Sequence, residues 1–345
     1  MPAAMLSNLQ NNKFNWSFQG EPEPKLNNRI LQHDRGKTLG GSSSINGMVY
    51  IRGHALDFDS WQEMGCEGWS YNDVLPYFIK MENYAGGDDN VRGVNGPVNV
   101  RRPIPSDVIS RAFLKAGEES GYLMTNDING DLQEGFGVFD STIHKGKRWS
   151  TARAYLDSVK TNDNLTILTE TLVEDIKIIN KKATGVNVKD KNGKIGFISA
   201  EKEVILSAGA VGTPHIMMLS GLGPKEHLQD NGISVINDLP GVGSNLNDHP
   251  DFVLKYKCIQ PISLWPKTKL VPRTLAGIKW FLTHKGMCAT NHFDVIGCVR
   301  SNSEVTYPDI QLCISPVAVD DQTWTPLQEH AFQIHVGLMQ VFSRG

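Results

Sequence analysis

The chain has 345 residues, of which 40% are hydrophobic and 21% are charged, a composition typical of folded globular proteins rather than of disordered chains. Its 34 Lys and Arg residues stand against 37 Asp and Glu residues, and this balance argues against a surface built to bind nucleic acid. The five cysteines are too scattered for a disulfide framework, and no spacing of histidines or cysteines predicts a metal site.

Hydrophobic periodicity predicts helices and strands in blocks along the chain. Helices are predicted at 69–81 with Ser70 as N-cap, at 107–121 with a glycine cap, at 151–159 and at 275–283. Short strands are predicted at 165–168, 173–179, 183–189 and 196–200, and a buried strand at 203–208. Such blocks indicate an α/β or mixed α+β fold with at least two layers.

A glycine- and serine-rich segment, Arg35–Met48, is the first that could carry chemistry. Its paired glycines, Gly40 and Gly41, allow the backbone to approach a ligand where a side chain would clash. Ser42 or Ser43 is predicted to cap a following helix and to direct its free N–H groups at an anion. The alternative is a glycine-rich loop joined to a helix without any ligand, and the residues alone leave both interpretations open.

The second such segment spans residues 203–223. The predicted strand ends at small residues, and Thr213 and Pro214 are predicted to be the N-cap and first position of a helix that stops at Gly221. Strand, small-residue turn and helix N-terminus form the geometry that receives nucleotides at the edge of an open sheet. An unliganded βα unit explains the pattern equally well. The usual GxGxxG dinucleotide fingerprint is not found between a strand and a helix.

Together the two segments resemble the paired signatures of the GMC (glucose–methanol–choline) flavin oxidoreductases. The similarity continues through residues 57–61, 68–71, 75–78 and 239–249. Further segments resemble the choline-oxidising members of the family, namely 129–130, 133–137, 142–150, 258–264 and 333–337. The resemblance implies an α/β FAD-binding domain interleaved with a substrate domain of a sheet and helices.

By this resemblance, residues 1–104 and 160–250 belong to the FAD-binding domain, and residues 105–159 and 251–345 to the substrate domain. Family members begin with a GxGxxG unit and end with a segment that supplies a catalytic histidine and a second His or Asn. Both segments are expected to lie outside this sequence, so no catalytic residue is assigned within it and this part of the enzyme alone is expected to be inactive. Four histidines are interpreted as hydrogen-bonded structural residues rather than as substitutes: His249, His292, His330 and His335.

The resemblance also implies FAD as the cofactor and names the residues that contact it. The flavin-lining positions are Gly40, Gly41, Ser43, Asn46, Gly47, Met48 and Val49. Val173 matches a valine whose backbone meets the adenine, and Ala208 and Gly209 match the turn near the ribose and pyrophosphate. Ile45 stands where some relatives carry a histidine bonded to the flavin, so FAD is expected to bind non-covalently.

The implied reaction is oxidation of a primary alcohol, with hydride passing to the flavin N5. Choline is the expected substrate and betaine aldehyde the product. A site for the permanent cation of choline needs aromatic faces and a carboxylate, and Phe293 and Asp294 offer one of each. Family members usually have glutamate at the position of Asp294. The alternative interpretation places Phe293 in the core and Asp294 in solvent.

Two other functions stay open from the sequence: a GMC enzyme for another alcohol, and a truncated product that binds partners without catalysis. The resemblance further implies a quinone-linked electron acceptor, peripheral association with a membrane and a place at the mitochondrial inner membrane. No nucleic-acid partner is expected.

Overall fold

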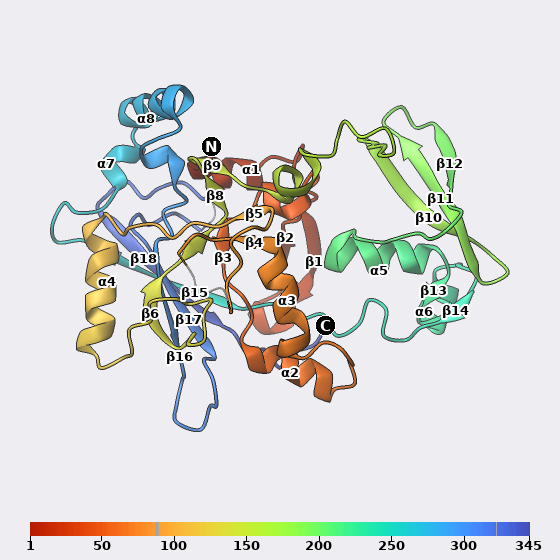
Figure 1. Ribbon diagram of the computed structural model, residues 1–345, viewed down its shortest axis with the longest axis horizontal. Helices are drawn as coiled ribbons and strands as arrows, with labels where there is room; N and C mark the ends of the chain where they lie inside the picture. Colours follow the sequence, from red (N-terminus) through yellow and green to blue (C-terminus); the bar gives the residue numbers. More distant parts are fainter. Residues whose placement is uncertain (87–89, 322) are drawn as a thin grey trace. The chain divides into compact units, whose positions relative to one another are not determined.

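The computed structural model describes residues 1–86, 90–321 and 323–345 (Figure 1). The chain forms two compact units. The larger unit comprises Met1–Asn162 and His249–Gln340, and the smaller unit comprises Asp163–Asp248 and Val341–Gly345. Both units contain helices and strands, which confirms the predicted mixed class. The assignment of four alternating segments to FAD-binding and substrate domains stays a prediction.

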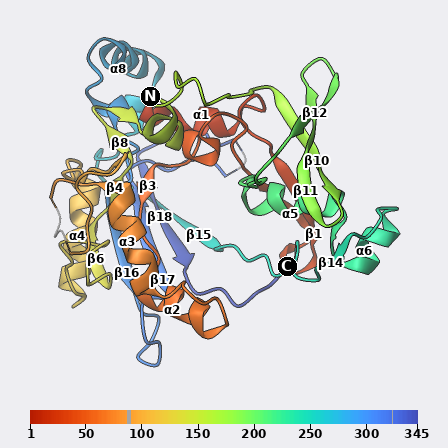
Figure 2. The same cartoon turned by 45° about the vertical axis from the view of Figure 1, so that its right-hand side comes forward.

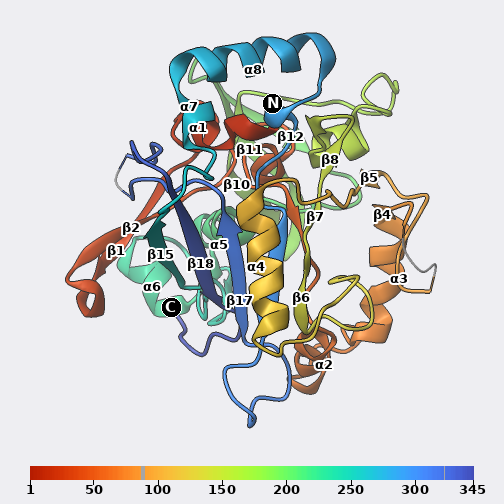
Figure 3. The same ribbon diagram turned by 90° about the vertical axis from the view of Figure 1, so that its left-hand side faces the viewer.

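A five-stranded antiparallel sheet lies at the centre of the larger unit (Figure 3). Its strand order is β15 (Asp251–Lys257), β18 (Ala331–Leu338), β17 (Ile310–Ser315), β16 (Val295–Val299) and β6 (Gly135–Val138). Helix α4 (Val108–Glu119) lies along β6, β16 and β17. There Ile109 joins Val295 and Ile314 in one core cluster. A second cluster contains Ile128, Phe139, Ile296 and Cys298.

Two predicted helices are confirmed; one begins at its predicted N-cap, Ser70, and the other begins with a side-chain cap that was not predicted. In α3 (Tyr71–Met81) the Ser70 side chain accepts a hydrogen bond from the Asp73 N–H at 3.3 Å, and the Asp73 carboxylate accepts one from the Ser70 N–H at 3.1 Å. In α4 the Asp107 carboxylate accepts from the Ser110 N–H at 2.8 Å. These capping bonds, which are reciprocal in α3, satisfy N–H groups that the first helical turn leaves unpaired.

Shorter elements complete the larger unit. The two-stranded pairs are β1 (Phe18–Glu23) with β2 (Arg29–His33), β3 (Val49–Tyr50) with β7 (Asp140–Ser141), β4 (Glu82–Asn83) with β5 (Val98–Asn99), and β8 (Ile143–His144) with β9 (Lys147–Arg148). The helical elements are η1 (Pro2–Ala4), α1 (Met5–Leu9), η2 (Pro24–Leu26), η3 (Gly41–Ser44), α2 (Ala55–Glu63), η4 (Ala152–Leu156), α7 (Trp265–Thr268), α8 (Leu270–Thr283) and η5 (Met287–Ala289). Helix α8 contains the predicted helix at 275–283.

The smaller unit is built on an antiparallel sheet of β10 (Thr171–Ile179), β11 (Lys182–Asp190) and β12 (Ile195–Ser199), which run side by side in Figures 1 and 2. These strands confirm the predictions at 173–179, 183–189 and 196–200. Helix α5 (Gly209–Leu219) packs against β10, and the Ser220 hydroxyl at its end accepts from the Ile176 N–H of β10 at 2.8 Å. The remaining elements are β13 (Leu222–Gly223), paired in parallel with β14 (Asn237–Asp238), and α6 (Lys225–Asp230).

Three predictions in the smaller unit were wrong. Residues 165–168 and 203–208 form no strand, and Ile205 is 76% exposed rather than buried. A strand forms by pairing, and no partner strand lies beside either segment in the described residues. Helix α5 begins at Gly209 and includes Pro214, so Thr213 is not its N-cap. The Thr213 hydroxyl instead accepts from the Ala208 N–H at 3.1 Å.

Candidate functional site

The first glycine-rich segment folds into a tight loop that ends in the single turn η3. Gly40 and Gly41 have φ values of +86° and +52°, a region that favours glycine. The predicted serine cap was wrong, because no longer helix follows and the serines bond to their own loop. The Ser42 hydroxyl accepts from the Gly36 N–H at 3.1 Å, and the Ser43 hydroxyl donates to the Gly40 carbonyl at 2.5 Å.

Residues 148–151 form hydrogen bonds to this loop. The Thr151 N–H donates to the Ser43 hydroxyl at 2.9 Å. Arg148 Nη1 donates to the Ser43 carbonyl at 3.1 Å and to Asn46 Oδ1 at 2.7 Å, whereas its buried Nη2 has no partner among the described residues. Burial lowers the pKa of Arg148 to about 10, so the guanidinium stays charged at neutral pH. Arg148 therefore places a cation and an unused N–H group beside the loop.

The end of the loop is buried and turns into β3. Met48 has no exposed surface and adopts φ +60°, and its N–H donates to Asn46 Oδ1 at 3.1 Å. The Thr142 N–H donates to the Met48 carbonyl at 2.9 Å. We therefore expect Met48 to act by holding its neighbours in position. Ile45 is 3% exposed and carries no group that could bond covalently to a ligand.

The structure brings the predicted substrate segment against the same loop. Asn291 Nδ2 donates to the Gly47 carbonyl at 2.7 Å. Phe293 and Val49 both pack against the core cluster that contains Ile296. The candidate flavin-lining segment and the Phe293–Asp294 pair, which are some 250 residues apart in sequence, thus belong to one locality of the larger unit.

Asp294 is buried in this locality, with an exposed fraction of 8%. Its Oδ1 atom has no hydrogen-bond partner among the described residues. Burial, with a smaller contribution from Asp107, raises the pKa of Asp294 to about 6, although Arg101 acts in the opposite direction. The expectation of a solvated Asp294 is therefore wrong, and a buried carboxylate with one unpartnered oxygen is suited to meeting a cation.

The cavity nearest this segment does not suit choline. It has a volume of about 520 Å³, and its wall, which includes Thr290, also carries Arg101, Lys145 and Lys285 and no carboxylate. A cation would be repelled there. A choline site at Asp294 therefore requires a different approach to the carboxylate.

Replacing Asp294 by asparagine tests its burial. A carboxyl whose folded pKa is raised keeps its proton between about pH 4 and about pH 6, where the unfolded chain has released it. Its contribution to stability therefore falls as pH rises through this window. We therefore expect the free energy of unfolding of Asp294→Asn to increase relative to that of the wild type as pH rises from about 4 to about 6. Above about pH 6 the difference between the two free energies should stay constant. Urea denaturation measured across this pH range tests the expectation, and Asp163→Asn, a substitution at an exposed residue, is the control. If the free energy of unfolding depends on pH in the same way in all three proteins, the expectation is contradicted.

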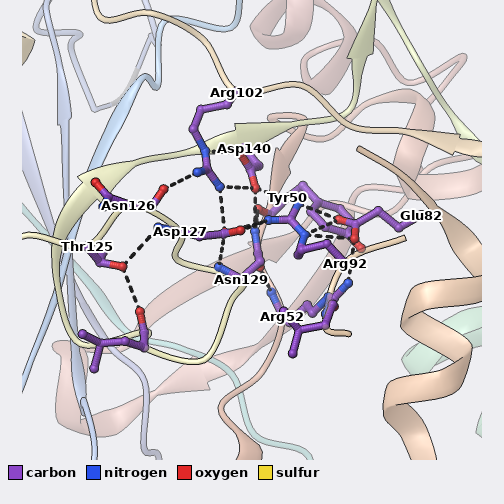
Figure 4. A network of polar contacts seen from close by, with 12 residues as sticks. Tyr50, Arg52, Glu82, Arg92, Arg102, Thr125, Asn126, Asp127, Asn129 and Asp140 are labelled. Carbon is purple, nitrogen blue, oxygen red and sulfur yellow. Dashed lines mark hydrogen bonds and ion pairs between the residues drawn. The ribbon is translucent and has the colours of Figure 1, made fainter. Parts of the chain in front are cut away.

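A buried ionic network supports the strand that leaves the loop (Figure 4). Arg92 lies at its centre and contacts three carboxylates: Glu82 at 2.7 Å, Asp127 at 2.6 Å and Asp140 at 3.0 Å. Arg52 pairs with Glu82, and Arg102 with Asp127 and Asp140. Burial lowers the pKa of Arg92, but the Glu82 hydrogen bonds and the surrounding carboxylates outweigh it and raise that pKa.

Asn129 joins this network to the strand. Its Nδ2 donates to the Tyr50 carbonyl at 3.1 Å and to Asp140 at 3.0 Å, while its Oδ1 accepts from the Arg52 N–H at 2.7 Å. Tyr50 belongs to β3, which follows the loop directly. The network thus fixes the end of the candidate flavin-lining segment.

The remaining predicted cofactor residues lie in the smaller unit. Val173 is on β10, an edge strand of its sheet, next to a bulge between Val173 and Asp175. Ala208 and Gly209 are exposed at the start of α5, and Gly209 has φ +83° with open space where a side chain would be. An edge strand and a helix N-terminus both offer unpaired backbone groups to a nucleotide. The structure does not place these residues and the glycine-rich loop in one unit.

The four histidines set aside in the sequence all have partners. His249 Nδ1 lies 2.7 Å from the Leu338 carbonyl, and His330 Nδ1 lies 3.0 Å from the Ser263 hydroxyl. His335 lies between Asp251 and Gln333. His292 is buried, which lowers its pKa, and it bonds to the Met287 backbone. These contacts are those expected of structural histidines.

Sequence reasoning missed Arg148, Thr151 and Asn291 as residues of the site. Arg148 lies in the run 142–150, which indicates only a resemblance to the family, Thr151 begins a predicted helix, and Asn291 lies two residues before Phe293. An arginine beside hydroxyl residues after a glycine turn is a weak signal. Nothing in it indicates contact with a loop about 100 residues earlier.

The residues of the loop fit a flavin. Open space surrounds the position that a side chain on Gly41 would take, so a ligand could lie against its backbone. Asn46 is exposed and its amide is oriented by Arg148. The Arg148 guanidinium that holds Asn46 adds a positive charge beside the loop. Bare backbone, an oriented amide and a cation form a donor set that suits the carbonyl and nitrogen edge of an isoalloxazine.

Comparison with known families decides the relationship. The sequence profile of the GMC oxidoreductases matches residues 8–251. The chain belongs to the GMC oxidoreductase family. It is 45% identical over 345 residues to the oxygen-dependent choline dehydrogenase of Brucella ovis and 44% identical to that of Rhizobium johnstonii. In both cases the alignment covers 100% of this chain and 62% of the relative, so this GMC chain spans less than two thirds of their length.

Solved structures of GMC enzymes share the fold. Pyridoxine 4-oxidase from Mesorbium loti superposes with a TM-score of 0.85 and 25% identity, covering 100% of this chain and 64% of that protein. Formate oxidase from Aspergillus oryzae gives a TM-score of 0.89 at 24% identity, covering 99% and 65%, which shows the fold alone. The relatives named here that share 44–45% identity are bacterial, and mitochondrial placement, quinone linkage and peripheral membrane association stay predictions.

Proposed function

We propose that the protein is part of an FAD-dependent alcohol dehydrogenase that oxidises choline to betaine aldehyde. The 45% identity to oxygen-dependent choline dehydrogenases over the whole chain carries this proposal. The contact between Asn291 and Gly47 supports it, because it sets the candidate substrate carboxylate in the same locality as the loop that fits a flavin.

In this proposal the flavin lies against Gly40, Gly41, Ser43, Asn46, Gly47 and Val49, with Met48 supporting them. Val173, Ala208 and Gly209 hold the adenosine end. When bound, FAD supplies the acceptor for the hydride. Phe293 and Asp294 are proposed to receive the quaternary ammonium group, through the face of the ring and the negative charge respectively. Because Ile45 offers no bonding atom, the cofactor is proposed to be non-covalent, and acid precipitation should release it from the protein.

Choline and its neutral isostere 3,3-dimethylbutan-1-ol provide the test. The full-length protein is loaded with FAD, and loss of the oxidised flavin absorbance is followed anaerobically with each alcohol. We expect choline to reduce the flavin at much lower concentration than the isostere. Asp294→Asn should remove most of that preference, while the response to the isostere stays unchanged. Equal responses of the wild type to the two alcohols would favour a GMC enzyme for another alcohol.

Ionisation of Asp294 adds a pH signature. Its pKa of about 6 means that the carboxylate is lost below this pH. The choline preference of the wild type should therefore weaken as pH falls through about 6, whereas that of Asp294→Asn should not change. Failure of the protein to retain any FAD would instead favour the non-catalytic alternative.

The electron acceptor is a separate part of the proposal. The resemblance favours a quinone, whereas the names of the relatives specify oxygen. Reoxidation of the reduced flavin by a soluble quinone and by oxygen, compared in one stopped-flow series, separates the two. Faster reoxidation by the quinone supports the quinone-linked proposal, and faster reoxidation by oxygen contradicts it.

A further inference from the structure

Arg101 and Asp294 are neighbours of opposite charge within the larger unit. The strip of chain that follows β6 bonds to both of them: the Phe139 N–H donates to the Asp294 carbonyl at 3.0 Å, and Ser141 exchanges backbone hydrogen bonds of 3.0 and 2.8 Å with Arg101. Arg101 Nη2 also donates to the Ala289 carbonyl at 3.3 Å, a few residues before Asp294. The residues that contact Arg101 in this way are buried, so its place beside Asp294 is set inside the unit and does not depend on what covers the surface.

The two side chains interact but do not pair. Burial lowers the pKa of Arg101, and Asp294 acts in the opposite direction. Burial raises the pKa of Asp294 to about 6, and Arg101 opposes that increase. In the described part of the chain the two side chains form no ion pair with each other, and Arg101 Nε and Asp294 Oδ1 both lack a hydrogen-bond partner. Each charge is therefore only partly compensated.

Few other charges act on the Asp294 carboxylate. Asp107, the N-cap residue of α4, adds a negative charge, and the Thr290 side chain forms a hydrogen bond with the carboxylate. Burial lowers the pKa of His292, on which Asp107 and Lys267 act in opposite directions, so its imidazole is neutral at pH values near 7. Among the described residues, Arg101 is thus the cation that acts on this carboxylate.

The surroundings of Arg101 leave Asp294 as its available carboxylate. The next residue, Arg102, directs its guanidinium into the buried ionic network instead (Figure 4). Arg101 lines the cavity of about 520 Å³, whose wall adds Lys145 and Lys285 and no carboxylate. Within the described ranges, Asp294 is the anion that acts on the Arg101 guanidinium.

We propose that Arg101 is a specificity-determining residue, a resident cation that competes with the cationic substrate for the Asp294 carboxylate. The inference rests on the proposed function, in which this carboxylate meets the quaternary ammonium group of choline. Specificity is a difference between two affinities, and a fixed cation beside the carboxylate lowers the affinity for choline without opposing a neutral alcohol. The same cation keeps the carboxylate ionised to lower pH. Arg101 thus weakens the preference for choline at high pH and preserves it as pH falls.

Flavin reduction by choline and by 3,3-dimethylbutan-1-ol tests the proposal in the full-length protein loaded with FAD. The preference for choline is the ratio of the two half-saturating concentrations, measured anaerobically from about pH 5 to about pH 9, a range that spans the ionisation of a raised carboxyl. At the upper end we expect Arg101→Met to prefer choline roughly tenfold more strongly than the wild type, because one interior charge contributes at least this much. Its preference should be lost at a higher pH than the value of about 6 expected of the wild type, so the two pH profiles should cross.

Three further variants make the result specific to charge. Arg101→Lys keeps a cation and should follow the wild type, whereas replacing a residue that only braces the Ala289 carbonyl would lower the preference at every pH. Arg101→Gln can still donate to that carbonyl but has no charge, so it should match Arg101→Met and provides the test if the methionine variant folds poorly. Lys145→Met removes an exposed cation from the same cavity wall and should leave the preference unchanged, because solvent screens that charge.

The proposal is overturned if the wild type prefers choline and the profiles of Arg101→Met and Arg101→Gln coincide with its own, or if Arg101→Lys behaves as they do. It is also overturned if Arg101→Met has the same effect when it is combined with Asp294→Asn, because the charge would then act on another group. In each of these cases the proposed function stands. Equal responses of the wild type to the two alcohols would instead contradict the choline specificity of the proposed function, and this inference with it.

Discussion

Arg92→Met is expected to lower the free energy of unfolding by about 3–5 kcal/mol, the range for removing one member of a buried ion pair. The guanidinium and the Glu82 carboxylate are both 0% exposed, and Asp140 beside them is equally buried. Without Arg92 these carboxylates lose their central partner in a medium that solvates charge poorly. Urea denaturation followed by tryptophan fluorescence measures the loss.

Two further variants make this result specific. Arg92→Lys keeps the charge, but its N–H donors lie on a single nitrogen and cannot span the positions that the three guanidinium nitrogens reach, so its stability should fall between those of the wild type and Arg92→Met. Lys191→Met breaks an ion pair with Glu170 whose two side chains are 61% and 64% exposed, and its effect should stay below about 1 kcal/mol. If Arg92→Met destabilises no more than Lys191→Met, the network does not hold the larger unit together.

Gly36→Ala is expected to weaken FAD retention by about tenfold to a hundredfold, because overpacking costs about 1–3 kcal/mol and each 1.4 kcal/mol is tenfold. A Cβ on Gly36 would lie 2.2 Å from the backbone C and O atoms of Gly41 and 2.6 Å from the Ser42 nitrogen. Backbone atoms cannot rotate away as a side chain can. The loop would have to open, and Gly41 would then leave the position in which we propose that it contacts the flavin.

The matched control for this variant is Gly196→Ala in β12, where the nearest atom to the new Cβ would be Val188 Cγ2 at an ordinary 3.7 Å. It should retain FAD as the wild type does. Equilibrium dialysis against FAD, read by flavin fluorescence, compares the three proteins. Unchanged retention by Gly36→Ala would mean that the loop does not bind the flavin.

Elements with local signals were predicted well. Helix α3 begins after Ser70 and α4 after Asp107 because the capping bonds lie within three residues of the helix start. The strands β10 to β12 follow from alternation and from turns close by in sequence. The segment 203–208 shows the limit: its apolar residues indicate a strand, but a strand also needs a neighbour, which sequence periodicity does not report.

The candidate site was likewise predicted only in part, where the signal is local in the sequence. The glycine-rich loop and Asp294 could be proposed from the sequence because residue type and order carry the signal. The residues that hold them could not, since Arg148 and Asn291 contact the loop across more than 100 and 240 residues of sequence. The buried network around Arg92 was not predicted, since its residues are also far apart in sequence. In the sequence alone, scattered arginines and carboxylates are typical of a solvated surface.

The strand order of the five-stranded sheet has a consequence for biosynthesis. β6 ends at Val138, yet its partner β16 begins at Val295, after the whole of residues 163–248 has been made. At about 5–20 residues per second, a ribosome needs on the order of 10–30 s to cover that interval. During this interval β6 has no partner strand, and the five-stranded sheet cannot be completed until β18 has been synthesised. We therefore expect nascent chains of this protein to depend on chaperones in that window.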